Sequence, residues 1–313
     1  MTDVSLAKCG SYDQEKVDAA VKAVMKPLGG FKAFFKKNEK VLLKPNLLRG
    51  CPPEAAVTTH PAVVDAVARA LIDLKCEVSL GDSSFFGSTR KTAEAAGLAE
   101  VCDRLGVPIV DLRKGKKVKF KNGIMPSLTL GKAALEADAI LNLPKLKTHS
   151  QMYYTCAVKN LFGCVSGPKK GLLHLTLADA EAFSQMLLDI NSVIKPRLNL
   201  VDAVIGMEGA GPARGTPKKA GFIAAGNSTL AVDWVTSGLV GLDRNKIFYL
   251  TQAQKRSEFK FNPIDVKVVG VEPAKLKIPA FKPAGLVSVE TMPIFVSRFS
   301  RLIRRSGIFN PLT

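Results

Sequence analysis

At 313 residues, with 47% hydrophobic and 23% charged side chains, the chain has the composition of a globular protein rather than of a disordered or low-complexity one. Its 45 Lys and Arg residues against 27 Asp and Glu residues give a net charge of +18, which favours acidic partners such as phosphates, anionic lipid or an acidic protein. Specific binding of nucleic acid is not expected, because the basic residues are scattered, are not interleaved with aromatic residues and form no nucleic-acid-binding motif.

Short β-rich apolar runs alternate with segments of helical spacing along most of the chain. The predicted strands are residues 4–9, 40–44, 76–81, 108–111, 139–143, 198–205, 221–225 and 266–271. The predicted helices are residues 14–25, 61–74, 89–105, 178–194 and 230–239. This alternation predicts parallel strands joined by crossover helices, and hence a three-layer, Rossmann-like α/β fold with a mainly parallel sheet.

Two stretches depart from the alternation. Residues 116–130 alternate polar and apolar side chains around Asn122 and Gly123, a pair typical of tight turns, so we expect an antiparallel hairpin inserted into the fold. The polar segment 144–171 is long and mostly lacks strand character, and loops of that length in compact domains tend to be functional.

We expect residues 1–280 to form a single α/β domain, or two packed subdomains, followed by a basic amphipathic extension over residues 281–313. A helix from Phe295 to Arg305 would place apolar and arginine side chains on opposite faces. Such a helix either packs on the core with a solvated basic face or makes a peripheral contact with a membrane surface.

The sequence predicts a cytoplasmic protein. Its N-terminal residues lack the basic and apolar regions of an export signal, and no apolar run approaches the length that spans a bilayer. The six cysteines are expected to be free thiols. Because none forms a C-x-x-C pair, neither a zinc ribbon nor an internal iron–sulfur ligand set is expected.

Four polar segments follow predicted strands, at the edge where open parallel sheets hold their ligands, and we expect them to converge on one pocket. In the first, Lys44 and Asn46 are expected to bind an anion, and Thr59 is either a further anion ligand or a capping residue before Pro61. In the second, Asp82 at the carboxyl end of its strand could bind ribose, a metal or a lysine ammonium, or it caps the next turn.

The third segment holds the densest group of polar residues, and its expected anion-binding residues are Lys145, Lys159 and Asn160. Lys147 and His149 lie two residues apart and point the same way if the backbone is extended. We expect these two to be catalytic, with His149 transferring protons, because imidazole titrates near neutral pH.

The fourth segment is too rich in glycine for a core helix, and its backbone N–H groups could approach a ligand closely. Arg214 is expected to bind the anion here, and Asp202 and Glu208 join Asp82 as candidate metal ligands. A weaker candidate in the chain is His174, which carries the same chemistry as His149 in less polar company.

Five segments in this order resemble the family catalogued as domain of unknown function 362: VLLKPNLL, AVTTHPAVVDAV, LGDSS, LNLPKLKTHS with CAVKNLFG, and DAVIGMEGAGPARGTP followed by LAVD. The resemblance covers residues 41–241 and implies an iron–sulfur-associated protein, because many members carry a ferredoxin-like module that binds two [4Fe–4S] clusters. The cysteine runs of that module are absent here. We therefore expect clusters only in a separate or partner ferredoxin-like protein.

A weaker similarity, in architecture only, is to the lactate-racemase-like proteins, which handle a nickel-bearing nucleotide with lysine and histidine. Fold analogy alone does not transfer that function.

Three hypotheses for function follow. The first is a redox-linked enzyme, an oxidoreductase or its substrate-binding domain, that binds an anionic substrate or a nucleotide-type cofactor. The second is a non-catalytic carrier of an anionic ligand or metallocofactor, which gains support if His149 and His174 are buried and satisfied by backbone. The third is a peripheral membrane or protein-docking module.

Overall fold

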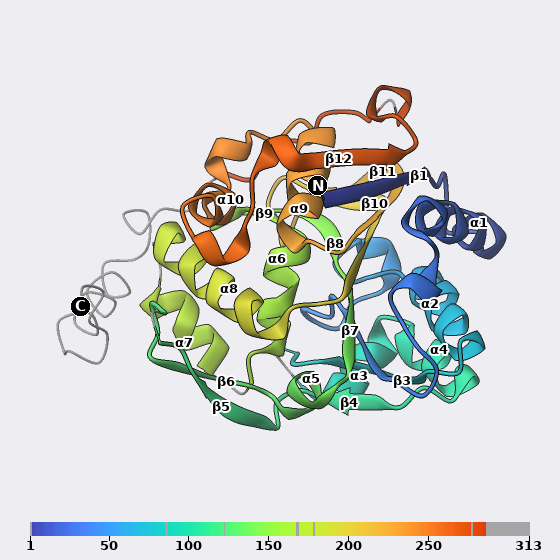
Figure 1. Ribbon diagram of the computed structural model, residues 1–313, viewed down its shortest axis with the longest axis horizontal. Coiled ribbons are helices and arrows are strands. Elements are labelled where there is room, and N and C mark those ends of the chain that lie inside the picture. The colour runs from blue at the N-terminus through green and yellow to red at the C-terminus, as the bar shows by residue number, and fades with distance from the viewer. Residues whose placement is uncertain are drawn as a thin grey trace.

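The computed structural model describes residues 2–285 except 85, 86, 122, 167, 168, 178 and 277. Within these residues ten strands form one sheet, in the order β12-β1-β11-β10-β7-β2-β3-β4, with β8 paired to β10 and β9 paired to β8 (Figure 1). The strands of this sheet are β1 (Thr2–Lys8), β2 (Lys40–Pro45), β3 (Glu77–Asp82), β4 (Ile109–Asp111), β7 (Ala139–Leu143), β8 (Lys145–His149), β9 (Tyr153–Thr155), β10 (Leu198–Glu208), β11 (Thr216–Gly226) and β12 (Val266–Gly270).

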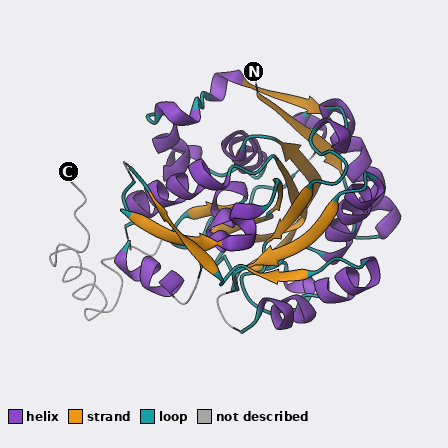
Figure 2. Cartoon of the chain, turned by 60° about the horizontal axis from the view of Figure 1, so that its bottom comes forward, coloured by secondary structure: helices purple, strands orange, loops and turns teal. Residues whose placement is uncertain are grey.

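Helices cover both faces of the sheet (Figure 2). The helices are α1 (Gln14–Met25), α2 (Pro61–Asp73), α3 (Thr89–Ala95), α4 (Leu98–Leu105), α5 (Lys132–Glu136), α6 (Ala157–Asn160), α7 (Lys169–Thr176), α8 (Ala180–Ile194), α9 (Thr229–Leu239) and α10 (Phe248–Ala253). Residues of α1, α2 and α4 join one apolar cluster, and residues of α6, α8, α9 and α10 join another.

Strand β2 shows how the sequence produces these layers. Val41 and Leu43 face the α1–α2–α4 cluster, while Leu42 between them faces the other, because successive side chains of a strand point to opposite faces. All three are essentially inaccessible to water. A strand buried on both faces reads as a continuous apolar run, which is typical of parallel sheets covered by helices.

The strand directions confirm the predicted three-layer, mainly parallel fold. Strands β4, β3, β2, β7 and β10 run parallel to one another, β11 runs antiparallel to both β10 and β1, and β12 is parallel to β1. The carboxyl ends of the central parallel strands therefore meet at one edge of the sheet.

The helix predicted over residues 89–105 is wrong as a single element, since α3 and α4 are separated at Gly97. This glycine has φ of 69°, in the left-handed region that ends helices. A Cβ at this position would lie 3.2 Å from Cγ of Pro61, so the close approach to α2 also favours glycine.

The prediction that residues 144–171 are mostly not strand-like is confirmed, since β8 and β9 account for the strand residues in the described part of this segment, but the segment is not one long loop. Strand β10 has 11 residues and extends past the end of β7, so its remaining edge pairs with β8, which begins immediately after Pro144. Strand β9 and helix α6 follow, and so this polar segment is ordered by pairing with a long neighbouring strand.

The predicted hairpin is confirmed as β5 (Gly115–Lys119) and β6 (Ser127–Gly131), which pair antiparallel in a small sheet of their own. Residues 120–126 connect the strands, so the turn is longer than the two-residue turn expected at Asn122 and Gly123. Leu128 and Leu130 are buried, and N–H of Ser166 donates to the Thr129 carbonyl at 2.8 Å, which fastens the hairpin to the domain.

Phe281 is buried and belongs to the core, while N–H of Lys282 donates to Oε2 of Glu208 at 2.8 Å. The expected helix from Phe295 to Arg305 lies outside the described residues.

A buried polar cluster joins the first loop of the chain to β10. Nζ of Lys145 lies 2.9 Å from Oδ2 of Asp202 and donates to the Tyr12 hydroxyl at 2.6 Å, and that hydroxyl donates to Oδ1 of Asp202 at 2.7 Å. N–H of His60 also donates to Asp202, at 2.9 Å, and the His60 ring stacks on Tyr12 at 3.6 Å. Both charged side chains are completely buried.

Replacing Lys145 by methionine leaves the Asp202 carboxylate buried without its cation. We expect the free energy of unfolding to fall by roughly 3–5 kcal/mol, measured by urea denaturation. The control is Lys275→Met, which breaks the exposed pair with Glu272 and should cost less than about 1 kcal/mol. Equal losses in the two variants would contradict a structural role for the buried pair.

Candidate functional site

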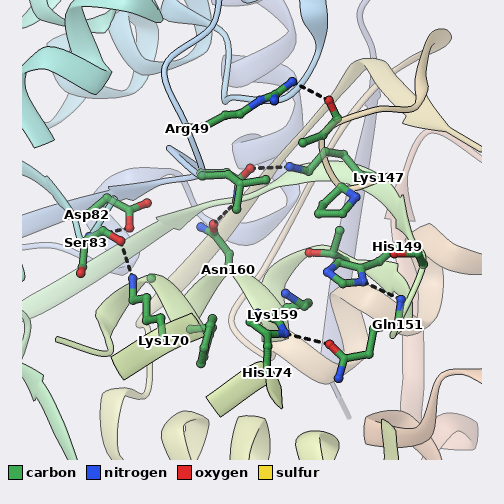
Figure 3. A pocket seen from close by; sticks show the side chains of 18 residues that line it. Arg49, Asp82, Ser83, Lys147, His149, Gln151, Lys159, Asn160, Lys170 and His174 are labelled. Atoms are coloured by element: carbon green, nitrogen blue, oxygen red, sulfur yellow. Dashed lines mark hydrogen bonds between the residues drawn. The ribbon is translucent and has the colours of Figure 1, made fainter. Parts of the chain in front are cut away.

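A pocket of 480 Å³ lies at the edge where the parallel strands end (Figure 3). Each of the four predicted polar segments contributes to its walls, after β2, β3, β8 and β10. The lining residues are Asn46, Leu48, Arg49, Asp82, Ser83, Lys147, His149, Ser150, Gln151, Thr155, Lys159, Asn160, Phe162, Gly163, Lys170, His174, Pro212 and Ala213.

Strand β8 places Lys147 and His149 in the pocket. Its pairing with β10 matches Lys145 to Asp202 and Lys147 to Met207, with a shift of register between the two pairs. Lys145 and Lys147 therefore meet different surroundings although they lie two apart on one strand. Lys145 is enclosed by the Asp202 cluster, and Lys147 reaches the cavity.

Lys147 is anchored by two acceptors. Its Nζ donates to Oδ1 of Asn46 at 2.7 Å and to the Val57 carbonyl at 2.8 Å. An ammonium group has three N–H bonds, so one stays available to a ligand.

From Asn46 a chain of side-chain amides runs back through the sheet. Nδ2 of Asn46 donates to Asn160 at 3.0 Å, Nδ2 of Asn160 donates to Asn142 at 2.8 Å, and Nδ2 of Asn142 donates to Asn199 at 2.8 Å. Nδ2 of Asn199 donates to the Gly226 carbonyl at 3.0 Å. Every bond points the same way, so each strengthens the next by polarisation.

Three lysines face the cavity without a carboxylate partner. None of the ion pairs that the described residues form includes Lys147, Lys159 or Lys170. Nζ of Lys159 lies over the rings of Phe162 and Phe183, 5.6 Å from each centroid, and Lys170 donates to the Ser83 carbonyl.

The three amines have lowered pKa values because they are buried and no carboxylate in the described residues pairs with them. Burial, and then the charge of Lys159, lower the pKa of Lys147 to about 7. Burial and the charge of Lys170 lower the pKa of Lys159 to about 7, and burial lowers that of Lys170 to about 8. The pocket therefore disfavours the positive charges of its own lysine side chains.

His149 is held in one tautomer. Its Nδ1 accepts hydrogen bonds from N–H of Gln151 at 3.1 Å and of Met152 at 3.2 Å, so the neutral ring carries its proton on Nε2. Burial, and then the charge of Lys159, hold the pKa of His149 well below its usual range. The ring is therefore a fixed hydrogen-bond donor at neutral pH.

His174 is the second imidazole of the pocket. Its Nδ1 lies 2.8 Å from Oε1 of Gln151, and its ring stacks on Phe183 with centroids 4.6 Å apart. Burial lowers its pKa to about 3.

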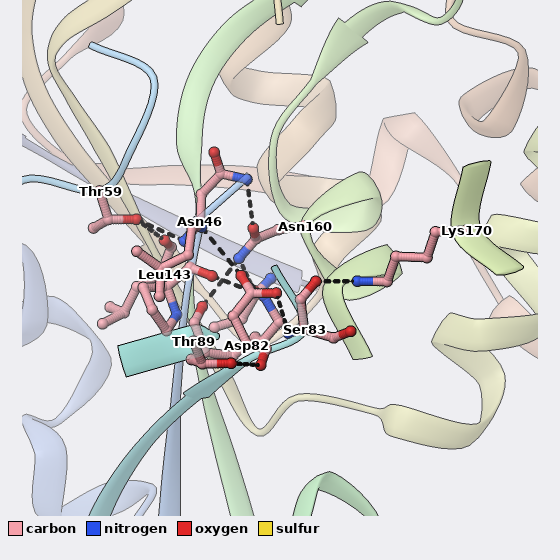
Figure 4. Close-up of polar contacts among 12 residues, drawn as sticks. Asn46, Thr59, Asp82, Ser83, Thr89, Leu143, Asn160 and Lys170 are labelled. Atoms are coloured by element: carbon pink, nitrogen blue, oxygen red, sulfur yellow. Dashed lines mark hydrogen bonds and ion pairs between the residues drawn. The ribbon is translucent and has the colours of Figure 1, made fainter. Parts of the chain in front are cut away.

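Lys44 and Asp82 form a buried ion pair of 2.8 Å behind the wall of the pocket. The Asp82 carboxylate also accepts from N–H of Leu47 at 3.1 Å and of Ser83 at 2.6 Å (Figure 4). Gly163 packs directly against Nζ of Lys44 and Oδ1 of Asp82, which leaves no room for a Cβ. Lys44 thus neutralises the one carboxylate among the residues that line the cavity.

Several candidates from the sequence lie outside the cavity. The hydroxyl of Thr59 donates to the Leu143 carbonyl at 2.6 Å and accepts from N–H of Asn46 at 2.9 Å, so it fastens the loop (Figure 4). Arg214 is exposed, although its neighbours Pro212 and Ala213 line the pocket. The candidates outside the lining are Lys44, Thr59, Lys145, Asp202, Glu208 and Arg214.

The candidate metal ligands do not come together. Asp82, Asp202 and Glu208 each engage a different lysine. No group of three His, Cys, Asp or Glu suited to a metal ion occurs in the described part of the chain. The pocket's ammonium groups have no lone pair for a metal while protonated, and they favour anions.

Sequence reasoning missed Arg49 and Lys170 as pocket residues, whereas Ser83 belongs to the polar segment around Asp82 that it placed at the pocket. Nη2 of Arg49 donates to the Ala213 carbonyl at 2.8 Å and so joins two loops at the pocket. Arg49 lies five residues after a predicted strand, and this position could have indicated a residue of the pocket. Lys170 lies on α7, a helix that the spacing of apolar residues did not predict.

Among the described residues, no helix combines the length and apolarity needed to cross a membrane. Thylakoid-associated protein sll1697 of Synechocystis is 39% identical to this chain over 241 residues, 77% of this chain and 75% of that protein.

A solved structure shares this architecture at low sequence identity. The lactate racemase apoprotein of Thermoanaerobacterium thermosaccharolyticum is 12% identical with a TM-score of 0.50, over 77% of this chain and 56% of that one. This chain therefore spans little more than half the length of that racemase chain, and the likeness concerns the fold. A Thermotoga maritima protein is also 12% identical, with a TM-score of 0.42, over 74% of this chain and 60% of that one.

The family model described as a domain of unknown function, DUF362, matches residues 41–237. This match contains β2 through most of α9, and with it every segment that lines the pocket. Together with the Synechocystis relative, it shows that the chain belongs to the DUF362 family.

Proposed function

We propose that the chain binds an anionic small molecule in this pocket. The observation that carries the proposal is the convergence of Lys147, Lys159 and Lys170 on one cavity with no carboxylate partner among the residues that the structure describes. Isolated buried charges are costly, and a bound anion would remove that cost. Arg49 and Nε2–H of His149 add donors of the same kind, so a carboxylate, a sulfate or the phosphate of a nucleotide-type cofactor fits.

The histidine geometry supports binding over proton transfer. The fixed tautomer and lowered pKa of His149 make it a donor at neutral pH and a poor base. Backbone N–H groups satisfy Nδ1 of the buried His149, which supports the carrier hypothesis over the redox enzyme. His174 does not meet the same criterion, because it is half-buried and its Nδ1 is paired with the side chain of Gln151. If a ferredoxin-like partner supplies electrons, they would reach a ligand held by these same lysines.

Binding of the anion should be coupled to proton uptake. In the free pocket Lys147 and Lys159 lose protons as the pH rises through about 7, and a bound anion raises both pKa values. Affinity for sulfate, whose own charge is constant here, should therefore fall from pH 7 to pH 9. Calorimetry at pH 8 in buffers of different ionisation enthalpy should detect proton uptake on binding. Sulfate binding without proton uptake would contradict this linkage.

The substitution Lys159→Met should weaken anion binding without lowering the stability of the fold. Since Nζ of Lys159 contacts aromatic rings and has no ion pair in the described residues, its loss should leave the urea midpoint unchanged or raised. Sulfate affinity should fall about 10-fold or more, because a charged contact of roughly 1.5–3 kcal/mol is lost.

The matched control is Lys219→Met, which removes an exposed cation of β11. It should change neither affinity nor midpoint. A Lys159→Met protein that binds sulfate normally, or that loses stability, would contradict the proposed role.

A second candidate function is peripheral contact with an anionic membrane. The hairpin β5–β6 and its flanks carry the exposed lysines Lys114, Lys116, Lys117, Lys119 and Lys121, and no acidic residue occurs from Leu112 to Leu135. Basic side chains near an anionic leaflet contribute about 1 kcal/mol each. The name of the Synechocystis relative, a thylakoid-associated protein, supports the same proposal.

Reversing two of these charges tests the membrane contact. Lys117→Glu with Lys119→Glu should weaken sedimentation with phosphatidylcholine–phosphatidylglycerol vesicles by about 10-fold or more. The control pair Lys22→Glu and Lys26→Glu lies at the exposed end of α1, away from the hairpin (Figure 1), and should have little effect. Equal binding to vesicles of phosphatidylcholine alone would rule out an electrostatic contact.

A further inference from the structure

The three pocket lysines lie in a row. Figure 3 shows Ser83 and Lys170 on one side of Asn160, and Lys147 and His149 on the other, with Lys159 between them. The electrostatic couplings agree with this order. The charge of Lys159 lowers the pKa of Lys147, and the charge of Lys170 lowers the pKa of Lys159, as expected of neighbours in such a row. The pocket therefore has two cationic ends and a shared cation.

At one end Ser83 offers a hydroxyl with no partner. The residue lines the cavity and is only 3% exposed, and Oγ has no hydrogen-bond partner among the described residues. A buried hydroxyl without a partner costs free energy, and a ligand atom that reached it at this end of the cavity would relieve that cost. The neighbouring cation, Lys170, is held by the Ser83 carbonyl, which keeps the ammonium at the same end.

The opposite end offers donors that are rigidly held. Nζ of Lys147 is fixed by Asn46 and Val57, and the proton of His149 is fixed on Nε2. Both side chains are at least 95% buried, with exposures of 1% and 5%. A fixed ammonium beside a neutral N–H donor suits one oxyanion, because both donate and neither accepts.

From this arrangement we propose that the ligand carries two anionic groups at opposite ends, one bound by Ser83 and Lys170 and the other by Lys147 and His149, with Lys159 shared. The inference rests on the proposed binding of an anion in this pocket. A ligand with a single carboxylate would leave one cationic end without a counter-charge, so it would recover only part of the desolvation cost. The class implied is a short molecule such as a dicarboxylate or a phosphorylated acid.

The test compares acids of one and two charges on the full chain at pH 6.5. Calorimetry would measure the affinity for butyrate and for malonate, succinate, glutarate and adipate. One dicarboxylate length should bind about 10-fold tighter than butyrate, the size of one added charged contact. Lys147→Met and Lys170→Met should each reduce this affinity to that of butyrate.

The affinity for butyrate should fall in one of the two lysine variants only, because butyrate occupies one end of the pocket. Ser83→Ala, a change too small to disturb folding of a loop, should weaken the preferred dicarboxylate several-fold and serves as the second variant at that end. The unfolding midpoint of each variant and of Lys219→Met provides the control.

Failure of the two proposals would look different. If neither sulfate nor any of the acids binds, anion binding in the pocket is wrong. If butyrate binds as tightly as every dicarboxylate, or if Lys170→Met leaves all affinities unchanged, the two-ended ligand is wrong and the anion site stands.

Discussion

The pocket depends on a one-directional chain of hydrogen bonds that begins at an ammonium group. Lys147 donates to Asn46, and amide groups then donate in turn through Asn160 and Asn142 to Asn199. Each asparagine contributes one acceptor and one donor to the chain, which fixes both its side-chain rotamer and the orientation of its amide. These hydrogen bonds join β8, the loop after β2, α6, β7 and β10, so the distances between these elements are set together.

This arrangement explains how a cavity can hold three amines without collapsing. Helix α6 is a single turn and would be unstable alone, yet the carboxylate of Asp233 accepts from N–H of Ala157 at 2.6 Å and of Val158 at 3.0 Å. Asn160 ties the other end of the turn to the sheet. Lys159, between these anchors, is carried into the cavity by a backbone that cannot relax away from its neighbours. The stability of the rest of the fold thus offsets the unfavourable free energy of holding three lysine side chains close together in the cavity.

Much of this could be predicted from the sequence because its signals are local. Polar residues directly after apolar runs identified the sheet edge, and four such runs correctly indicated segments that line one pocket. The alternation that places Lys147 and His149 on the same side of the backbone could be predicted from their spacing, and so could the hairpin. These features depend on periodicity and on the order of residues, which a single sequence contains.

Other features depend on partners distant in sequence. Lys145 and Lys147 have the same local pattern, and only the shifted register on β10 separates a buried structural lysine from a pocket lysine. Pairing of β8 was missed because the edge that it completes belongs to a strand about 50 residues later, from Leu198 to Glu208. Lys170 was missed because its helix is short and its role arises from contact with Ser83, 87 positions away in the chain.

The Lys44–Asp82 pair has a consequence for what the pocket can attract. Asp82 reaches the cavity wall close to Lys170, and without a partner of its own it would serve as that lysine's counter-ion. Lys44 occupies the carboxylate from behind, and the missing side chain of Gly163 lets the two stay in contact. The positive net charge of the cavity therefore depends on Lys44, a side chain that does not line it.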